Sequence, residues 1–313
     1  MAKSTLKPVF WLGAKSLGIC MYEKQLQKVD LSHHPKRHGG QAASPFRYPG
    51  GKGFLTSFLA GELNRRFSSQ KPSFAEPYCG GAGAALNLLV DGLVNHVHLN
   101  DADVRVYSAW WAMVNETERF IQAINDTDAT IENWEKCLRV LHDTTSETYD
   151  FEVGFSAFFI NRTSRSGVLL GSGPIGGYNQ NGNWKIDAGY YRTSLCKRIT
   201  KLSELKDSIS ITNMDGLEFC VSLKQRGILQ DTFLFIDPPY MKAGGRLYHD
   251  GMTEKKHAAL AKWLKEGHAP HWLLTYDDHP VVRENYQEMQ DYTLEVRYSL
   301  AKRRMEAELL YMS

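Results

Sequence analysis

Short apolar runs, each followed by polar residues, recur along the chain. They cover 73–76, 96–100, 209–214, 233–236 and 271–276. Runs of this length are typical of buried strands in a parallel sheet. Stretches with apolar residues at helical spacing lie between them, for example 84–90 and 253–264, the second with Thr253 as a predicted helix cap. This alternation predicts an α/β fold around a mainly parallel sheet, with an antiparallel closing strand at 308–312.

The apolar run at 233–236 is followed directly by Asp237-Pro238-Pro239-Tyr240. Two prolines cannot continue a strand ladder, so the tetrad lies at the carboxyl end of the strand, where open α/β sheets bind ligands. A carboxylate and a nearby carbonyl can both accept hydrogen bonds from an exocyclic amine, while the tyrosine ring can stack on a base. Two such acceptors make the amine a better nucleophile. The tetrad therefore indicates methyl transfer to a nucleobase amine, and the alternative is a strand-ending turn.

A glycine-rich bend follows the strand predicted at 73–76. It contains Glu76, Tyr78, Gly80, Gly81 and Gly83. Glycines let a ligand approach the backbone closely, but the pattern is not G-x-G-x-x-G and no phosphate-binding Lys-Ser/Thr follows. Asp101 ends the next strand, where an acid can accept hydrogen bonds from ribose hydroxyls. The amino half therefore predicts a cofactor with a nucleoside but no phosphates, and a methyl-donating sulfonium nucleoside fits.

A proline and two glycines precede Lys52, and a helical pattern begins at residue 54. A lysine at such a junction can pair with an anionic group of a ligand that arrives at the start of the helix. The alternative is an ordinary surface turn.

Composition sets broad limits. The chain has 313 residues and 42% hydrophobic content, enough for one large or two modest domains. Its five cysteines form no C-x-x-C pair and no long apolar run occurs, so we expect a reduced, cytoplasmic protein without a membrane span. His33, His34 and His38 have no acid or cysteine at ligand spacing, so we expect no metal site.

Charge is unevenly distributed. The net charge is only +2, yet residues 1–43 carry seven Lys or Arg against two acids. Such a basic extension could contact a polyanion. It is equally compatible with a disordered tail, or with a true start at Met21.

A second basic segment runs from 161 to 201. It has seven Lys or Arg and one acid, interleaved with aromatic residues and glycines. This composition is typical of a loop that contacts DNA phosphates and enters a groove. The stretch 179–183 predicts a hairpin tip whose amides contact base edges, or else a solvated hairpin. The candidate DNA contacts are Asn161, Arg162, Arg165, Asn179, Asn181, Lys185, Arg192 and Lys197.

Five features occur in a fixed order: RYPGGK at 47–52, FAEPYCGGAG at 74–83, the acid Asp101, FFINRT at 158–163, and DPPY at 237–240. Together they resemble the Dam-like adenine-N6 DNA methyltransferases, the D12 class of the α group. The resemblance implies a Rossmann-like, S-adenosylmethionine-dependent methyltransferase sheet of seven strands, mixed but mainly parallel, with an inserted helical and loop-rich target-recognition domain. It also implies double-stranded DNA as substrate, with the target adenine flipped out of the helix.

The resemblance also implies roles for individual residues. Tyr48 and Lys52 would hold the methionine end of the cofactor, and the bend at 76–83 would surround it. Asp101 would bind the ribose. Asp215, at the end of the strand predicted at 209–214, would hydrogen-bond the cofactor adenine.

The DPPY residues would hold the target base. Asp237, Pro238, Pro239 and Tyr240 would bind and activate its amine, and Asp237 would border the cofactor as well. The implied division is a catalytic domain at 44–108 and 202–313, with a target-recognition domain inserted at 109–201 and a basic extension before it.

One departure limits the resemblance. Residues 164–167 read SRSG, unlike the enzymes that methylate GATC, so no recognition sequence is carried over. The alternatives are a cytosine-N4 or RNA amine methyltransferase, or an inactive DNA-binding protein of the same fold. We expect a monomer or weak dimer, and the sequence leaves open whether a restriction enzyme or a phage context accompanies it.

Overall fold

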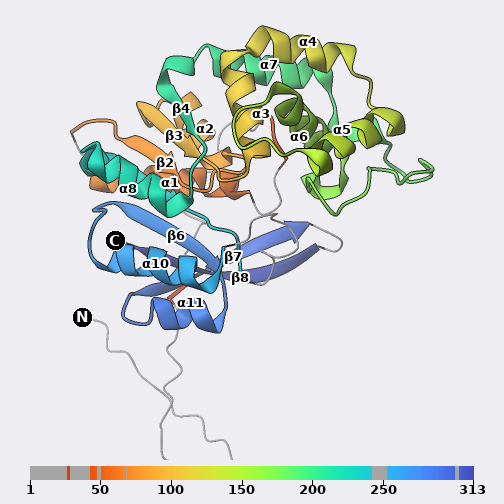
Figure 1. Cartoon of the computed structure of the whole chain (residues 1–313). Coiled ribbons are helices and arrows are strands. Elements are labelled where there is room, and N and C mark those ends of the chain that lie inside the picture. Colours follow the sequence, from red (N-terminus) through yellow and green to blue (C-terminus); the bar gives the residue numbers. More distant parts are fainter. Residues whose placement is uncertain (1–26, 29–42, 48–50, 68, 242–251, 300–302) are drawn as a thin grey trace, which may run out of the picture.

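The computed structural model describes residues 27–28, 43–47, 51–67, 69–241, 252–299 and 303–313 (Figure 1). Two features predicted from sequence lie outside these residues. They are Tyr48, which was expected to bind cofactor, and the histidines at 33, 34 and 38.

The described part of the chain forms one mixed sheet in the order β1-β7-β8-β6-β5-β2-β3-β4. The parallel strands are β2 (Ser73–Glu76), β3 (His96–Asn100), β4 (Ile209–Thr212), β5 (Thr232–Ile236) and β6 (Trp272–Asp277). At the other side, β8 (Arg303–Met312) is antiparallel to both β6 and β7 (Asp291–Ser299). Six of these strands, β2–β6 and β8, were expected from sequence, and the predicted antiparallel closing strand is confirmed. The seventh, β7, had not been located from sequence.

An eighth strand was not expected. The two-residue β1 (Gln27–Lys28) pairs in parallel with β7, at the edge of the sheet. It comes from the basic extension, so at least this part of the extension joins the sheet.

The order of the strands creates a switch point between β2 and β5. From β2 the chain proceeds to β3 and β4 on one side, and then returns to place β5 and β6 on the other side. Connections leave the carboxyl ends of β2 and β5 in opposite directions, and ligands bind in the crevice that opens there. Glu76 ends β2, and Asp237 directly follows β5.

Helices cover both faces of the sheet. One face is covered by the 3-10 turn η1 (Lys52–Leu55) and by α1 (Thr56–Arg66), α2 (Gly83–Val90) and α3 (Val104–Asn115). The same core extends to α4 (Thr117–Asp126), α5 (Ile131–Asp143), α6 (Phe151–Thr163) and α7 (Arg192–Ser203), which pack on α3 and on one another. The other face is covered by α8 (Gly216–Gln225), α10 (Glu254–Lys265) and α11 (Pro280–Asn285). None of the described helices is long and apolar enough to span a bilayer.

The side-chain alternation of β5 explains how the sheet supports two helical layers. Phe233 and Phe235 pack into the core shared with α1–α7, whereas Leu234 and Ile236 pack against α8 and α10. Helices α3–α7 gather in the upper part of Figure 1, and their apolar residues are continuous with the core of the sheet. The predicted domain boundaries stay a prediction.

Side-chain caps set several helix starts. Thr253 accepts a hydrogen bond from the Lys256 amide at the start of α10, which confirms the predicted threonine cap. Asp103, Asp150 and Asp215 cap α3, α6 and α8 in the same way.

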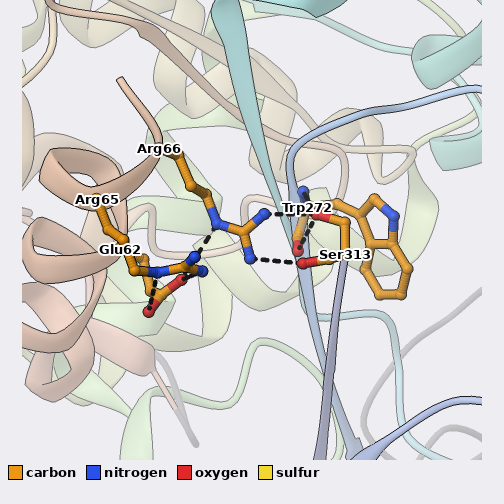
Figure 2. Close-up of polar contacts among 5 residues, drawn as sticks. All are labelled: Glu62, Arg65, Arg66, Trp272 and Ser313. Atoms are coloured by element: carbon orange, nitrogen blue, oxygen red, sulfur yellow. Dashed lines mark hydrogen bonds and ion pairs between the residues drawn. The ribbon is translucent and has the colours of Figure 1, made fainter. Parts of the chain in front are cut away.

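A polar cluster ties the end of β8 to α1 (Figure 2). The Arg66 guanidinium donates to the hydroxyl and to the carbonyl oxygen of Ser313, at 2.7 Å each. Its Nε donates to Glu62 at 3.1 Å, and the Trp272 amide donates to the Ser313 hydroxyl. Arg65 also pairs with Glu62, but its side chain is 61% exposed and makes no contact with β8 in this cluster.

These contacts predict unequal effects for two neighbouring arginines. Arg66→Ala should lower the free energy of unfolding by about 1–3 kcal/mol, because it removes charge-assisted hydrogen bonds to Ser313, which follows β8, from a side chain that is only 8% exposed. The matched control Arg65→Ala should cost less than about 1 kcal/mol, since it removes an exposed ion pair. Urea unfolding monitored by tryptophan fluorescence measures both. Equal losses of free energy of unfolding in the two variants would contradict the role of Arg66 in joining α1 to the end of β8.

Candidate active site

Asp237 is the centre of a cluster of polar groups at the switch point. Its Oδ1 accepts hydrogen bonds from the Thr275 hydroxyl at 2.6 Å and the Tyr240 hydroxyl at 3.0 Å. Its Oδ2 accepts from the Lys52 ammonium at 3.0 Å, and that ammonium also donates to the Tyr240 oxygen at 2.8 Å. The Asp237 side chain is 23% exposed, so it is firmly held but still open to a ligand. Pro238 is buried and Pro239 is partly exposed.

Lys52 brings a buried positive charge to this cluster. Its side chain is only 3% exposed, and its ammonium lies 3.6 Å from Glu308 Oε2 as well as beside Asp237. It also lies 5.0 Å from the centroid of the Tyr240 ring. A buried ammonium is tolerated where carboxylates and hydrogen bonds compensate for its lost hydration.

The pattern of the strands explains why these groups meet. Side chains alternate between faces, so Asp237 shares a face with Phe235, and Thr275 shares that face with Leu273. In β8, Glu308 lies on the same side as Leu310. Lys52 begins η1, which belongs to the helical layer on that face.

Thr275 and Glu308 were not identified from sequence as site residues. The available signal was a polar residue inside an apolar strand, at a position that alternation places on the Asp237 face. That signal becomes informative only when the order of β5, β6 and β8 is known.

The glycine-rich bend adopts left-handed backbone conformations. Gly80 has φ of 43°, and the non-glycine Ala82 has φ of 45°. The indole of Trp110 donates to the Gly80 carbonyl at 2.8 Å, which fixes the bend to α3. Gly81 and Gly83 are partly exposed at the start of α2. Left-handed alanine is unfavourable, and such strain persists only where the surroundings hold it in place, often at ligand sites.

Asn100 joins three strand ends and was also missed from sequence. Its side-chain amide donates to the carbonyls of Pro77 and Met214, at 2.9 Å each, and its Oδ1 accepts from the Met214 amide at 3.0 Å. Its own carbonyl accepts from the Cys79 amide. The residue is fully buried. Asn100 thus sets the relative positions of the loops that follow β2, β3 and β4.

Asp101, directly after β3, faces the glycine-rich bend. Its two carboxylate oxygens accept from the Gly80 amide at 2.9 Å and the Asp103 amide at 3.0 Å. Desolvation, followed by the charge of Asp103, raises the pKa of Asp101 to about 7. A carboxylate has about four lone-pair sites, so acceptor capacity remains after these two bonds.

Glu76 is a buried carboxyl group at the end of β2. It accepts a hydrogen bond from the Ala85 amide in the first turn of α2, at 3.0 Å. Burial, with a further contribution from the charge of Asp237, raises the pKa of Glu76 to about 8. Glu76 is therefore mostly neutral at pH 7, and its direct partner is the protein backbone.

Asp215 and Tyr78 lie beside each other at the start of α8. Asp215 Oδ1 caps the helix through the Leu217 amide, and Oδ2 pairs with Lys256 at 2.8 Å. Burial alone would raise the pKa of Asp215, but Lys256 and the capped amides bring it below its ordinary value. A Cβ at Gly216 would lie 2.3 Å from the Tyr78 ring, so only glycine leaves room for that ring.

These residues fit a nucleoside cofactor without phosphates. Asp101 keeps acceptor sites for ribose hydroxyls, and Asp215 presents a partly exposed carboxylate. The bend offers backbone amides rather than a lysine or arginine that could neutralise a phosphate. Asp101, Asp215 and the bend come from the ends of three adjacent strands, as predicted.

The prediction that Asn161 and Arg162 contact DNA is wrong, because both side chains are buried. Asn161 is fully buried, where it exchanges two hydrogen bonds with the Arg47 backbone and donates to the Gly167 carbonyl. Arg162 is 8% exposed and donates to the carbonyls of Gly189 and Pro45. Burial lowers the pKa of Arg162 to about 9. Both side chains connect α6 to the segments around it and do not reach the surface.

The remaining predicted DNA contacts are on the surface. Arg165, Asn179, Asn181 and Lys185 are exposed in the loop after α6. The predicted hairpin at 179–183 is wrong, because the loop forms successive turns there instead. Gln180 holds these turns by donating to the carbonyls of Ile175 and Gly177 and accepting from the Ile186 amide.

Arg192 and Lys197 line a cleft of about 1000 Å³ at the start of α7. Arg192 pairs with Asp128 and donates to the Thr127 carbonyl, whereas Lys197 is exposed. Tyr191, 62% exposed, lies on the same cleft. The basic and aromatic character predicted for this segment is thus displayed at the surface.

Comparisons with known proteins give one strong match. The model of the family described as D12 class N6 adenine-specific DNA methyltransferase matches residues 48–300. Among solved structures, the rRNA methyltransferase aviRa from Streptomyces viridochromogenes matches with 14% identity and a TM-score of 0.33, over 87% of this chain and 90% of that chain. No curated protein matches the chain in sequence.

The raised pKa of Glu76 predicts how stability depends on pH. The unfolded chain loses this proton near pH 4.5, whereas the folded protein holds it until about pH 8. Its contribution is therefore complete below about pH 4.5 and is lost as pH rises to about 8. Between pH 5 and pH 8, Glu76→Gln should lose about 3 to 4 kcal/mol less free energy of unfolding than the wild type.

Urea unfolding at the two pH values measures this difference. Glu218→Gln, at an exposed position on α8, is the control and should keep the wild-type dependence. If Glu76→Gln and the wild type lose the same free energy of unfolding between pH 5 and pH 8, Glu76 is not held neutral in the folded protein.

Proposed function

The chain belongs to the D12 class of N6 adenine-specific DNA methyltransferases, and from this premise we propose how its own residues carry out the reaction. Its sheet is the predicted Rossmann-like methyltransferase sheet. The family transfers a methyl group from S-adenosylmethionine to N6 of adenine in DNA. The observation that carries the proposal is the placement of Asp237 at the switch point, partly exposed and oriented by Lys52, Thr275 and Tyr240.

Asp237 and the Pro238 carbonyl are proposed to hold the target amine. The N6 lone pair of adenine is delocalised into the ring, so the free amine is a weak nucleophile. Hydrogen bonds from its two hydrogens to these two oxygens return electron density to nitrogen. Thr275 and Tyr240 fix the carboxylate in advance, so little reorganisation is needed during the reaction. The Tyr240 ring provides a surface on which the base stacks.

The bound S-adenosylmethionine supplies an electrophilic methyl group on a positively charged sulfur. When N6 bonds to the methyl carbon, the bond from that carbon to sulfur would break, with S-adenosylhomocysteine as the leaving group, so that N6 would carry one proton more than the product and a positive charge. The Asp237 carboxylate, already hydrogen-bonded to that amine, is the proposed first acceptor of the proton. No stronger base is required, because a methylated ammonium of this kind is acidic.

The cofactor is proposed to bind along the ends of β2, β3 and β4. Asp101 accepts from the ribose hydroxyls, Asp215 accepts from the adenine amine, and the bend at 76–83 packs around the nucleoside. The predicted contact of Lys52 with the methionine end remains a proposal. In the described conformation, its ammonium is directed to Asp237, Tyr240 and Glu308.

Double-stranded DNA is proposed to bind across the loop after α6 and the start of α7. This segment, within the proposed target-recognition domain at 109–201, carries the exposed Arg165, Lys185 and Lys197. Phosphate contacts from these side chains would fix the DNA, while Asn179 and Asn181 are available for base edges. The target adenine must leave the helix, because its amine is otherwise unreachable. Oligomeric state, a cognate restriction enzyme and cytoplasmic location stay predictions.

Asp237→Ala should reduce methyl transfer by at least about a thousandfold, since the substitution removes both the orientation of the amine and the proton acceptor. The affinity for S-adenosylhomocysteine should change less than about threefold, because Asp237 faces the target base. Single-turnover kinetics with labelled donor and calorimetric titration measure the two quantities. Near-normal turnover in this variant would contradict the role of Asp237.

Arg165→Ala should weaken DNA binding and reduce the slope of log K against log salt by about 0.9, the value for one lost phosphate contact. Lys262→Ala is the matched control, because Lys262 is 78% exposed on α10, which covers the opposite face of the sheet. Fluorescence anisotropy with a labelled duplex at several salt concentrations measures both slopes. An unchanged slope for Arg165→Ala would place this side chain outside the interface.

A further inference from the structure

We propose that Glu308 is a positioning residue. When the target amine replaces the Lys52 ammonium at Asp237, the ammonium moves to Glu308. The inference rests on the proposed function of this site. It assigns a role to a carboxylate that the mechanism above does not use.

Lys52 lies between two acids of the same sheet face. Its ammonium is 3.0 Å from Asp237 Oδ2 and 3.6 Å from Glu308 Oε2. The Lys52 and Glu308 side chains are almost completely buried, at 3% and 2% exposure, whereas that of Asp237 is 23% exposed. Of the two acids, only Asp237 is therefore open to a substrate, whereas Glu308 lies beside Lys52 in the interior of the protein.

The hydrogen bonds of Asp237 explain why an exchange is needed. Oδ1 already accepts from two hydroxyl groups, those of Tyr240 and Thr275, so its acceptor sites are filled. An incoming amine must then share Oδ2 with the Lys52 ammonium or displace it. An ammonium bound to Oδ2 partly neutralises the Asp237 carboxylate. The carboxylate would then activate the target amine less strongly.

Glu308 is well placed to take the ammonium. Its strand, β8, lies between β6 and β7. Glu308 is opposite Asp277 of β6 and Leu294 of β7, so its backbone is fixed. The lysine has a flexible four-carbon chain, and a small movement closes the remaining gap to Glu308. The positive charge then stays compensated while Asp237 binds the base, which avoids the large cost of an unpaired buried charge.

The first test needs no enzymatic activity. A crystal structure of Asp237→Asn should show the Lys52 ammonium within about 3.2 Å of Glu308, because the amide no longer attracts the positive charge. A lysine that stays beside residue 237, or that turns away from both positions, would overturn the proposal. This result stands whether or not the protein methylates DNA.

The second test separates chemistry from binding. Glu308→Gln should lower the single-turnover rate constant at least about tenfold, which corresponds to about 1.4 kcal/mol, while the dissociation constants for cofactor and duplex change less than about threefold. Glu308→Asp keeps the negative charge and should recover most of the rate. Asp291→Asn, which removes a partly buried carboxylate on β7 paired with Arg283, is the control and should keep the wild-type rate.

Three outcomes of the kinetic test would overturn the assignment. They are a wild-type rate in Glu308→Gln, a loss that Glu308→Asp does not relieve, and a loss that appears equally in Asp291→Asn. Methyl transfer by the wild-type protein tests the proposed function separately, so failure of that function and failure of the Glu308 assignment give different results.

Discussion

The orientation of one partly exposed carboxylate is the constraint on which the rest of the structure depends. Asp237 follows a fully buried strand and is fixed by the Thr275 and Tyr240 hydroxyls and by Lys52. Burial of β5 between two helical layers makes its end rigid, and the two prolines stop the ladder there. A rigid acceptor is what activation of a weakly nucleophilic amine requires, because the acceptor must be in place before charge develops.

In the proposed mechanism, the same rim brings the cofactor and the target base together. Asn100 ties the loops after β2, β3 and β4 to one another, and these loops carry Asp101 and Asp215. Lys52 begins the turn η1 that leads into α1, and its ammonium pairs with Asp237. It therefore joins this helical segment to the end of β5. Asn161 and Arg162 anchor the backbone of Arg47 and Pro45, just before this segment. The α6 residues thus support the active site from the interior rather than contacting DNA.

Much of the fold could be predicted from sequence, because short apolar runs and helical spacing report burial directly. Strands β2–β6, α10 with its Thr253 cap and the antiparallel β8 all follow from such patterns, whereas β7 was not predicted as a strand. The placement of Asp101, Asp215 and Asp237 at neighbouring strand ends follows from the same logic. Two-residue β1 could not be predicted, since so short a strand leaves no periodic pattern.

The rest of the site depends on contacts between distant segments. Thr275 and Glu308 become recognisable only when β5, β6 and β8 are known to be neighbours. Asn161 and Arg162 were assigned to DNA from their residue type, yet buried backbone carbonyls satisfy their donors. In the loop after α6, the side-chain bonds of Gln180 favour turns over the predicted hairpin.

The most direct measurement is nucleoside mass spectrometry of duplex DNA after incubation of the purified protein with S-adenosylmethionine that carries an isotopically labelled methyl group. The account predicts that the label appears in N6-methyladenine. Label in N4-methylcytosine, label only when RNA replaces DNA, or no label in any nucleoside would contradict it.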